Sequence, residues 1–145
     1  MEQLYSILGK VTITDLLQIL EAMGTQDTAT VLKVLRANYK NGLQAIDILN
    51  SITDLFRNLF YFKYLPEDEN FTSLSDSEKE LIKNCNYIIS AKDLSRILDM
   101  LDEINQSIKT SPSQELKLEL FLVKLIKPQL ATDIKSVSRR VDMLE

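Results

Sequence analysis

The sequence predicts an all-α fold, a compact bundle of about six to seven helices with no sheet. Apolar residues recur along most of the chain at spacings of three and four, which is the period of an amphipathic helix. Capping residues, Gly or Pro stand at the ends of these stretches, where helices begin and end. With 145 residues, 45% of them hydrophobic, the chain is also long enough to bury about two-thirds of its unfolded surface in one core.

The longest helical stretch runs from Leu43 to Leu65 and is the expected central helix. Its apolar residues spread over roughly 200° of the helix circumference, more than the stripe of an ordinary surface helix. They are Ala45, Ile46, Ile48, Leu49, Ile52, Leu55, Phe56, Leu59, Phe60 and Tyr64. Such a helix must be covered from at least two directions, by neighbouring helices or by another protein.

Two shorter helices are expected before the central helix. Thr12 and Asp15 resemble a capping box that opens the first, and Gly24 follows its apolar stripe as a terminator. The second has its apolar positions within residues 31–39 and is closed by Asn41 and Gly42. The short link to the central helix favours an antiparallel pair.

After the central helix, Pro66 ends the helical pattern and residues 67–73 are the expected long loop. Ser75 and Glu78 form a capping box for a shorter helix. Ser90, with Asp93, then caps the clearest amphipathic helix, whose apolar residues are Leu94, Ile97, Leu101, Ile104 and Ile108.

Residues 115–127 could form a helix or a strand, because leucine occupies every second position from Leu116 to Leu122. The helix is favoured, since Leu, Glu and Lys are good helix formers and no other segment offers a strand to pair with. Ser111, Pro112 and Gln114 are expected to supply its N-cap, first-turn proline and capping-box partner.

The organisation expected from these elements is one helical domain over residues 1–128, followed by a helical extension over residues 129–145. Residues 1–9 look like the end of a preceding linker or helix. The extension repeats apolar residues at three and four, which predicts a helix of about four turns.

Composition argues against several classes of function. The 17 basic and 21 acidic residues are interspersed and sum to a net charge of −4, which gives no electrostatic footprint for nucleic acid. The single cysteine, Cys85, cannot form an internal disulfide, which is compatible with a reducing cytosol. No apolar run approaches the length of a bilayer span, so we expect a soluble cytoplasmic protein that does not contact a membrane.

The residues of a chemical site are not found. The chain contains no histidine, which removes the commonest general base at neutral pH and most zinc sites. Gly9-Lys10 lacks the upstream Gly and the following Ser or Thr of a phosphate-binding loop. The carboxylate pairs formed by Asp99 or Asp102 with Glu103 fit the solvated side of a helix better than a catalytic pair. We therefore predict no catalytic, cofactor-binding or metal-binding residues, no cofactor and no small-molecule substrate.

The aromatic run near the end of the central helix permits three interpretations. Its residues are Phe56, Phe60, Tyr61, Phe62 and Tyr64. They could belong to the core, form a protein interface, or stack on nucleic-acid bases. The last is the weakest interpretation because no basic groove accompanies the aromatics. Arg57 is most simply a snorkelling side chain or a partner of Asp54.

Seven segments of the chain follow one another in a distinctive order. They are Leu20–Gly24, Asn41-Gly42, Leu55–Lys63, Ser73–Ser75, Ser90–Leu94, Ser111-Pro112 and Leu116–Leu125. In this order they resemble the third domain of the bacterial DNA polymerase III gamma/tau clamp-loader subunit. The resemblance spans about residues 8–127 and consists of packing patterns.

This resemblance implies a helical collar through which clamp-loader subunits assemble into a pentamer in the bacterial cytoplasm during DNA replication. The implied partners are other gamma/tau copies, delta and delta-prime, with no direct contact to nucleic acid. The family's ATPase module is not encoded in these 145 residues, so this chain should not hydrolyse ATP. No polymerase-binding region is recognisable.

The surplus apolar surface of two helices, 43–65 and 116–126, predicts where such a collar would bind its neighbours. The candidate interface residues are Phe56, Arg57, Phe60, Tyr64, Leu116, Leu120 and Lys124. Two alternatives stay open: the homologous collar of the delta subunit, and a free-standing helical adaptor that grips a peptide in a groove.

Overall fold

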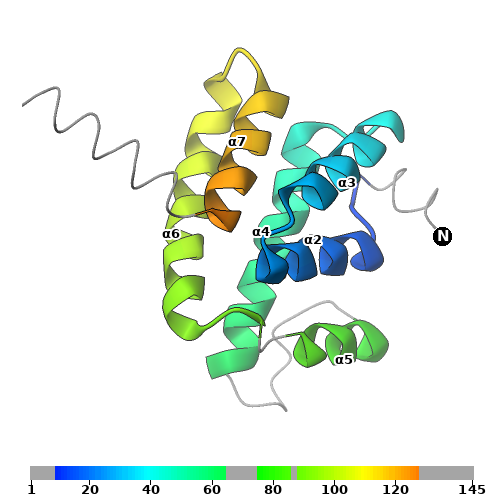
Figure 1. Ribbon diagram of the computed structural model, residues 1–145, viewed down its shortest axis with the longest axis vertical. Helices are drawn as coiled ribbons and strands as arrows, with labels where there is room; N and C mark the ends of the chain where they lie inside the picture. The colour runs from blue at the N-terminus through cyan, green and yellow to red at the C-terminus, as the bar shows by residue number, and fades with distance from the viewer. Residues whose placement is uncertain (1–8, 65–74, 86–87, 128–145) are drawn as a thin grey trace, which may run out of the picture.

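A computed structural model describes residues 9–64, 75–85 and 88–127. Over these residues it has six α-helices, one short 3₁₀ helix and no strand, which confirms the predicted all-α bundle. In chain order the elements are α2 (Ile13–Thr25), α3 (Thr28–Lys40), α4 (Ala45–Tyr64), α5 (Asp76–Asn84), α6 (Ala91–Ser107), η2 (Ile108–Thr110) and α7 (Gln114–Ile126) (Figure 1).

Helix α4 is the centre of this bundle, as predicted. It contacts each of the other five α-helices among the described residues (Figure 1). Its buried residues are Ala45, Ile48, Leu49, Ser51, Ile52, Leu55, Phe56 and Leu59. Neighbouring helices of the same chain therefore cover most of its wide apolar surface.

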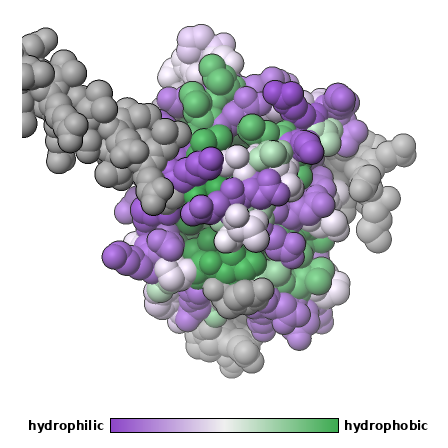
Figure 2. All heavy atoms as spheres, in the orientation of Figure 1, coloured by the Kyte–Doolittle hydropathy of each residue, from purple (hydrophilic) through white to green (hydrophobic). Residues whose placement is uncertain are grey.

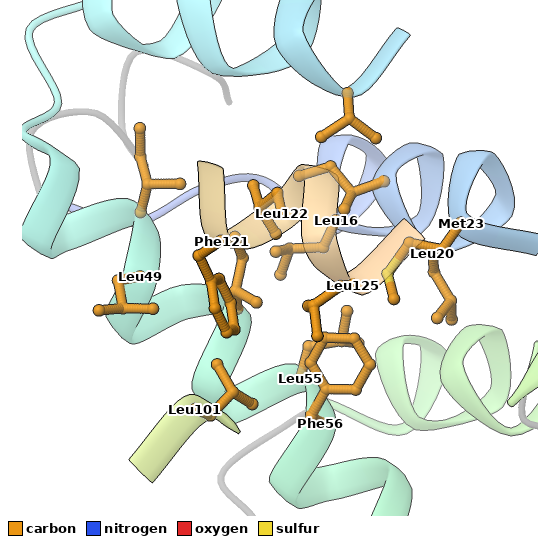
Figure 3. Packing of buried hydrophobic residues seen from close by; sticks show 14 of the residues in the cluster. Leu16, Leu20, Met23, Leu49, Leu55, Phe56, Leu101, Phe121, Leu122 and Leu125 are labelled. Atoms are coloured by element: carbon orange, nitrogen blue, oxygen red, sulfur yellow. The ribbon is translucent and has the colours of Figure 1, made fainter. Parts of the chain in front are cut away.

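The core joins helices that are far apart in the sequence. Close up, the side chains from α2, α4, α6 and α7 point toward one another (Figure 3). The labelled members are Leu16, Leu20, Met23, Leu49, Leu55, Phe56, Leu101, Phe121, Leu122 and Leu125. Helices α6 and α7 form a hairpin through η2, and α4 packs against both of them.

The start of α2 uses half of the expected capping box. Thr12 accepts a hydrogen bond at its hydroxyl from the backbone N–H of Asp15, over 3.2 Å. The Asp15 carboxylate accepts a hydrogen bond from the side-chain amide of Asn38, also over 3.2 Å. Asp15 thereby connects α2 to α3, which adds a tertiary link to the cap.

The end of α2 differs from the prediction at Gly24. The helix continues through Gly24 to Thr25, and Gln26 closes it in the left-handed region with φ of 59°. Gly24 instead allows close packing, because a Cβ built there would lie 2.9 Å from Cγ2 of Ile88. The expected end of α3 is confirmed: Asn41 is its C-cap and Gly42 follows with φ of 94°.

The predicted caps of α5 and α6 are confirmed. The N–H of Glu78 donates to the Ser75 hydroxyl, and the N–H of Ser75 donates to the Glu78 carboxylate, each over 3.2 Å. This is a complete capping box. Ser90 likewise accepts from the N–H of Asp93 over 3.2 Å and opens α6.

Residues 114–126 form a helix, which settles the choice between helix and strand. Its N-cap is Ser113, which accepts from the N–H of Leu116 over 3.4 Å, and not the predicted Ser111. Ser111 lies two residues earlier and donates its hydroxyl to the Ser113 carbonyl. The predictions for residues 67–73 and 129–145 concern segments outside the described residues.

Candidate protein interface

The structure separates the predicted interface residues into buried and exposed positions. Phe60, Tyr64, Leu116 and Leu120 are exposed large hydrophobic residues, Arg57 is exposed and Lys124 is half-buried. Phe56 is 0% exposed. Phe56 therefore belongs to the core, and its prediction as an interface residue is wrong, because the face of α4 that carries it is covered by neighbouring helices.

The last turns of α4 carry a cluster of aromatic rings at the surface. Phe60 is 39% exposed and Tyr64 is 59% exposed. The ring centroids of Phe60 and Tyr64 are 5.0 Å apart, and those of Phe60 and Tyr61 are 5.9 Å apart in an edge-to-face arrangement. These distances are typical of favourable aromatic pairs, so the rings hold each other in place at the surface.

A groove of about 640 Å³ lies between α4 and α6 beside these rings. We name it the aromatic groove, and its main lining residues are Asp54, Arg57, Phe60, Tyr61, Asp102 and Asn105. The side-chain amide of Asn105 donates to the Thr53 hydroxyl over 3.1 Å. This hydrogen bond connects α6 to α4 within the groove.

The Arg57 side chain follows the simpler of the expectations for it. Its guanidinium lies 3.2 Å from the Asp54 carboxylate one turn earlier, and both side chains are more than half exposed. A surface pair of this kind contributes at most about 1 kcal/mol to stability. Both side chains are therefore able to reach a partner.

Leu116 and Leu120 form a ridge one turn apart on α7, which we name the leucine ridge. Each is about half exposed, whereas Leu118 and Leu122 of the same helix are completely buried. Leu120 also lines a smaller groove of about 230 Å³ between α6 and α7, together with Lys117 and Lys124. The leucine ridge is therefore bordered by lysines on the side facing α6.

The outer surface of α6 carries three exposed carboxylates, Asp99, Asp102 and Glu103, which we name the acidic face. The ion pairs between described residues join Arg57 to Asp54 and Arg96 to Asp93. The acidic face is thus unpaired within those residues, and its exposure agrees with the prediction of a solvated helix side.

The groove also contains Asp102 and Asn105, neither of which the sequence analysis predicted as an interface residue. Leu98, Leu101, Asp102 and Asn105 are spaced as one side of a helix, and this spacing is visible in the sequence. This spacing indicates a groove only in combination with the packing of α6 beside α4. On the face shown in Figure 2, hydrophobic residues emerge in separate patches among hydrophilic ones.

The ionisable groups with shifted pKa values do not form a chemical site. Burial raises the pKa of the half-buried Cys85 thiol, and the charge of Glu21 raises it further. Cys85 therefore holds its proton at neutral pH and is a poor nucleophile. Within residues 9–64, 75–85 and 88–127, no group of three or more Cys, Asp or Glu residues could hold a metal ion.

Burial also raises the pKa of the Tyr39 phenol, and the charges of Glu119 and Glu115 on α7 add to the effect. Its oxygen has no hydrogen-bond partner among the described residues.

None of the helices described is long and apolar enough to span a membrane.

The model of a family described as DNA polymerase III subunits gamma and tau domain III matches residues 1–139. No curated protein matches the chain.

Proposed function

The chain belongs to the family of domain III of the DNA polymerase III subunits gamma and tau, and from this premise we propose that it is a non-enzymatic oligomerisation domain. In this role it is a collar that holds clamp-loader subunits together during DNA replication. The proposed partners are other gamma/tau copies, delta and delta-prime.

The observation that carries this proposal is the placement of the exposed apolar side chains. Phe60 and Tyr64 lie together at the end of α4, and Leu116 and Leu120 lie together on α7. Apolar residues scattered singly over a surface need no explanation, whereas clustered ones beside grooves are typical of protein interfaces.

The proposed mechanism is burial of these apolar side chains between neighbouring collars. Removing apolar surface from water supplies the driving force, at about 25 cal/mol per Å². The charged residues beside each cluster, Arg57 on α4 and Lys124 on α7, would contribute mainly to orientation and to partner choice.

The test measures association of the full chain with purified gamma/tau, delta and delta-prime by analytical ultracentrifugation. We expect complexes with the wild type, and weaker complexes with Phe60→Asp and Leu120→Asp. Leu81→Asp is the matched control, because Leu81 is 44% exposed on α5 and lies outside both clusters. A chain that is strictly monomeric and binds none of these subunits would overturn the proposal.

A further inference from the structure

We propose that residues 129–145 of this chain fold back as a helix into the smaller groove, between α6 and α7. The groove has a volume of about 230 Å³, and side chains of Met100, Ile104 and Phe121 give it an apolar lining. Leu120 also lines it and is half exposed in the part of the chain that the structure describes. The proposed occupant lies outside the described residues, and its helix is predicted from the sequence.

The path of the chain favours this occupant. Lys124 lines the groove, and Lys127, the last described residue, follows it by three positions as the C-cap of α7. Pro128 comes next and cannot continue the hydrogen bonding of the helix, which favours a turn at this end of the groove. As a helix, residues 130–144 would be about 22 Å long, and the 13 residues of α7 span about 20 Å. The segment is therefore long enough to run back along the whole groove, antiparallel to α7.

The residues of the segment suit an apolar groove. Apolar residues recur at spacings of three and four and give a helix a single apolar stripe. They are Leu130, Ile134, Val137, Val141 and Leu144. A single stripe needs cover from one side only, which a groove on the surface of the bundle provides. The match to the domain III family also continues past α7 to residue 139, so the family includes the first part of this segment.

The charges are complementary when the segment runs antiparallel to α7. In that direction, helical geometry places Asp133 on the flank facing α7 and Lys135 on the flank facing α6. The groove carries Lys124 on its α7 wall and Glu103 on its α6 wall. Neither of these two residues forms an ion pair with another described residue. Docking therefore sets Asp133 beside Lys124 and Lys135 beside Glu103.

One charge opposes the docked arrangement. Arg140 falls on the same flank as Asp133, seven residues further along, where Lys117 lines the α7 wall. Like charges placed opposite each other lower affinity, so Arg140 should weaken the docking. A segment that ran in the opposite direction would turn Arg140 toward the α6 wall. Arg140 therefore reports the direction of the helix.

Docking has a consequence for assembly, and this consequence rests on the proposed function. Leu120 belongs both to this groove and to the leucine ridge. A docked segment therefore shields one edge of the ridge. Release of the segment should strengthen association with the other loader subunits.

The experiment measures hydrogen–deuterium exchange of the full chain by mass spectrometry. The amides of residues 130–144 should exchange at least about tenfold faster in Val137→Asp than in the wild type, because a short helix without tertiary contacts is marginally stable. Arg139→Asp is the matched control, because Arg139 lies opposite the apolar stripe, and it should exchange like the wild type. Met100→Asp changes the groove instead and should also release the segment. Circular dichroism checks that these variants keep the fold.

Charge variants test the direction of the segment. Asp133→Lys and Lys124→Glu should each speed the exchange of residues 130–144, and the two changes combined should restore slow exchange. Arg140→Glu should slow it below the wild-type rate, because it places a carboxylate opposite Lys117. Faster exchange in Arg140→Glu would overturn the antiparallel direction.

Three further results would overturn the inference. The segment could exchange as fast in the wild type as in Val137→Asp, which would show that it is not docked. Exchange could be unchanged in Met100→Asp, which would place the segment elsewhere. Protection could increase with protein concentration, which would show that the segment binds a second copy.

These results are separate from the test of the proposed function, which is association of the wild type with the loader subunits. If Val137→Asp releases the segment and associates no more tightly than the wild type, the shielding of the leucine ridge is wrong.

Discussion

Helices α4 and α7 both carry more apolar residues than one helix face can hold, but the fold buries these residues to different extents. Helix α4 contacts all five of the other described α-helices and buries its apolar surface except at its last turns. Helix α7 contacts α2, α3, α4 and α6 but leaves Leu116 and Leu120 half exposed along one side. A wide apolar surface therefore shows that a helix must be covered. Its position in the bundle decides whether helices of the same chain cover it.

The largest test of this difference is Phe56→Ala in α4. Phe56 is completely buried, so its removal should lower the free energy of unfolding by about 3–5 kcal/mol. Urea unfolding followed by circular dichroism measures this change. Phe60→Ala, one turn later on the same helix, is the matched control and should cost far less. Similar losses for the two variants would contradict the division of α4 into a core part and a surface end.

Ser51→Ala tests the covered side of α4 through a polar contact. The Ser51 hydroxyl accepts a buried hydrogen bond from the backbone N–H of Val11 over 3.1 Å and donates to the carbonyl of Asp47. The substitution leaves the N–H of Val11 without this partner and should cost about 1–3 kcal/mol in unfolding free energy. Thr53→Ala is a milder control, because the Thr53 hydroxyl is only partly buried. An unchanged stability for Ser51→Ala would show that the N–H of Val11 finds another acceptor.

Tyr39→Phe tests how closely α7 covers α3. The phenol oxygen of Tyr39 is buried without a hydrogen-bond partner among the described residues, so its removal should raise the unfolding free energy by about 1 kcal/mol at pH 7. Tyr61→Phe, on the surface of α4, should have little effect.

The same variant should change the response to alkaline pH. The pKa of Tyr39 is higher in the folded chain than in the unfolded chain, so the folded state holds the proton more tightly. The corresponding stability is complete below about pH 10 and is lost as the pH rises toward the folded pKa. The stability gap between Tyr39→Phe and the wild type should therefore widen above that pH. A gap that stays constant would mean that the Tyr39 phenol is solvated in the folded chain.

The smallest expected effect is that of Leu120→Gln on stability. Leu120 is half exposed on α7, and Gln has a similar length and a similar helix propensity. The unfolding free energy should change by less than about 0.5 kcal/mol. Leu118→Gln, two residues earlier and completely buried, should destabilise the chain severely. If the two changes have similar effects, α7 is covered on both sides and the leucine ridge is not a free surface.

Many helix boundaries could be predicted from the sequence, because the hydrogen bonds of a helix cap join residues only three or four positions apart. Ser75 with Glu78, and Ser90 with Asp93, marked helix starts that the structure confirms. The start of α7 was placed two residues early, because Ser111 and Ser113 both suit an N-cap. Gly24 was misread as a terminator because a glycine can serve either a turn or close packing, and only the tertiary contact with Ile88 distinguishes them.

The surface was less predictable, because exposure depends on which helices become neighbours. Phe56 and Phe60 are four residues apart on one helix and have the same side chain, yet one is completely buried and the other is 39% exposed. Asp102 was assigned to the solvated side of its helix, and Asn105 was not predicted as a site residue, because the aromatic groove exists only where α6 packs beside α4. Pairings between distant segments cannot be read from helical periodicity alone.

The contact between Gly24 and Ile88 has a consequence for how related sequences should vary. A Cβ at position 24 would lie 2.9 Å from Cγ2 of Ile88, so the two positions share one small volume. Where a relative carries alanine at the position of Gly24, we expect a smaller side chain at the position of Ile88. The two positions should therefore covary, although they lie more than sixty residues apart in the chain.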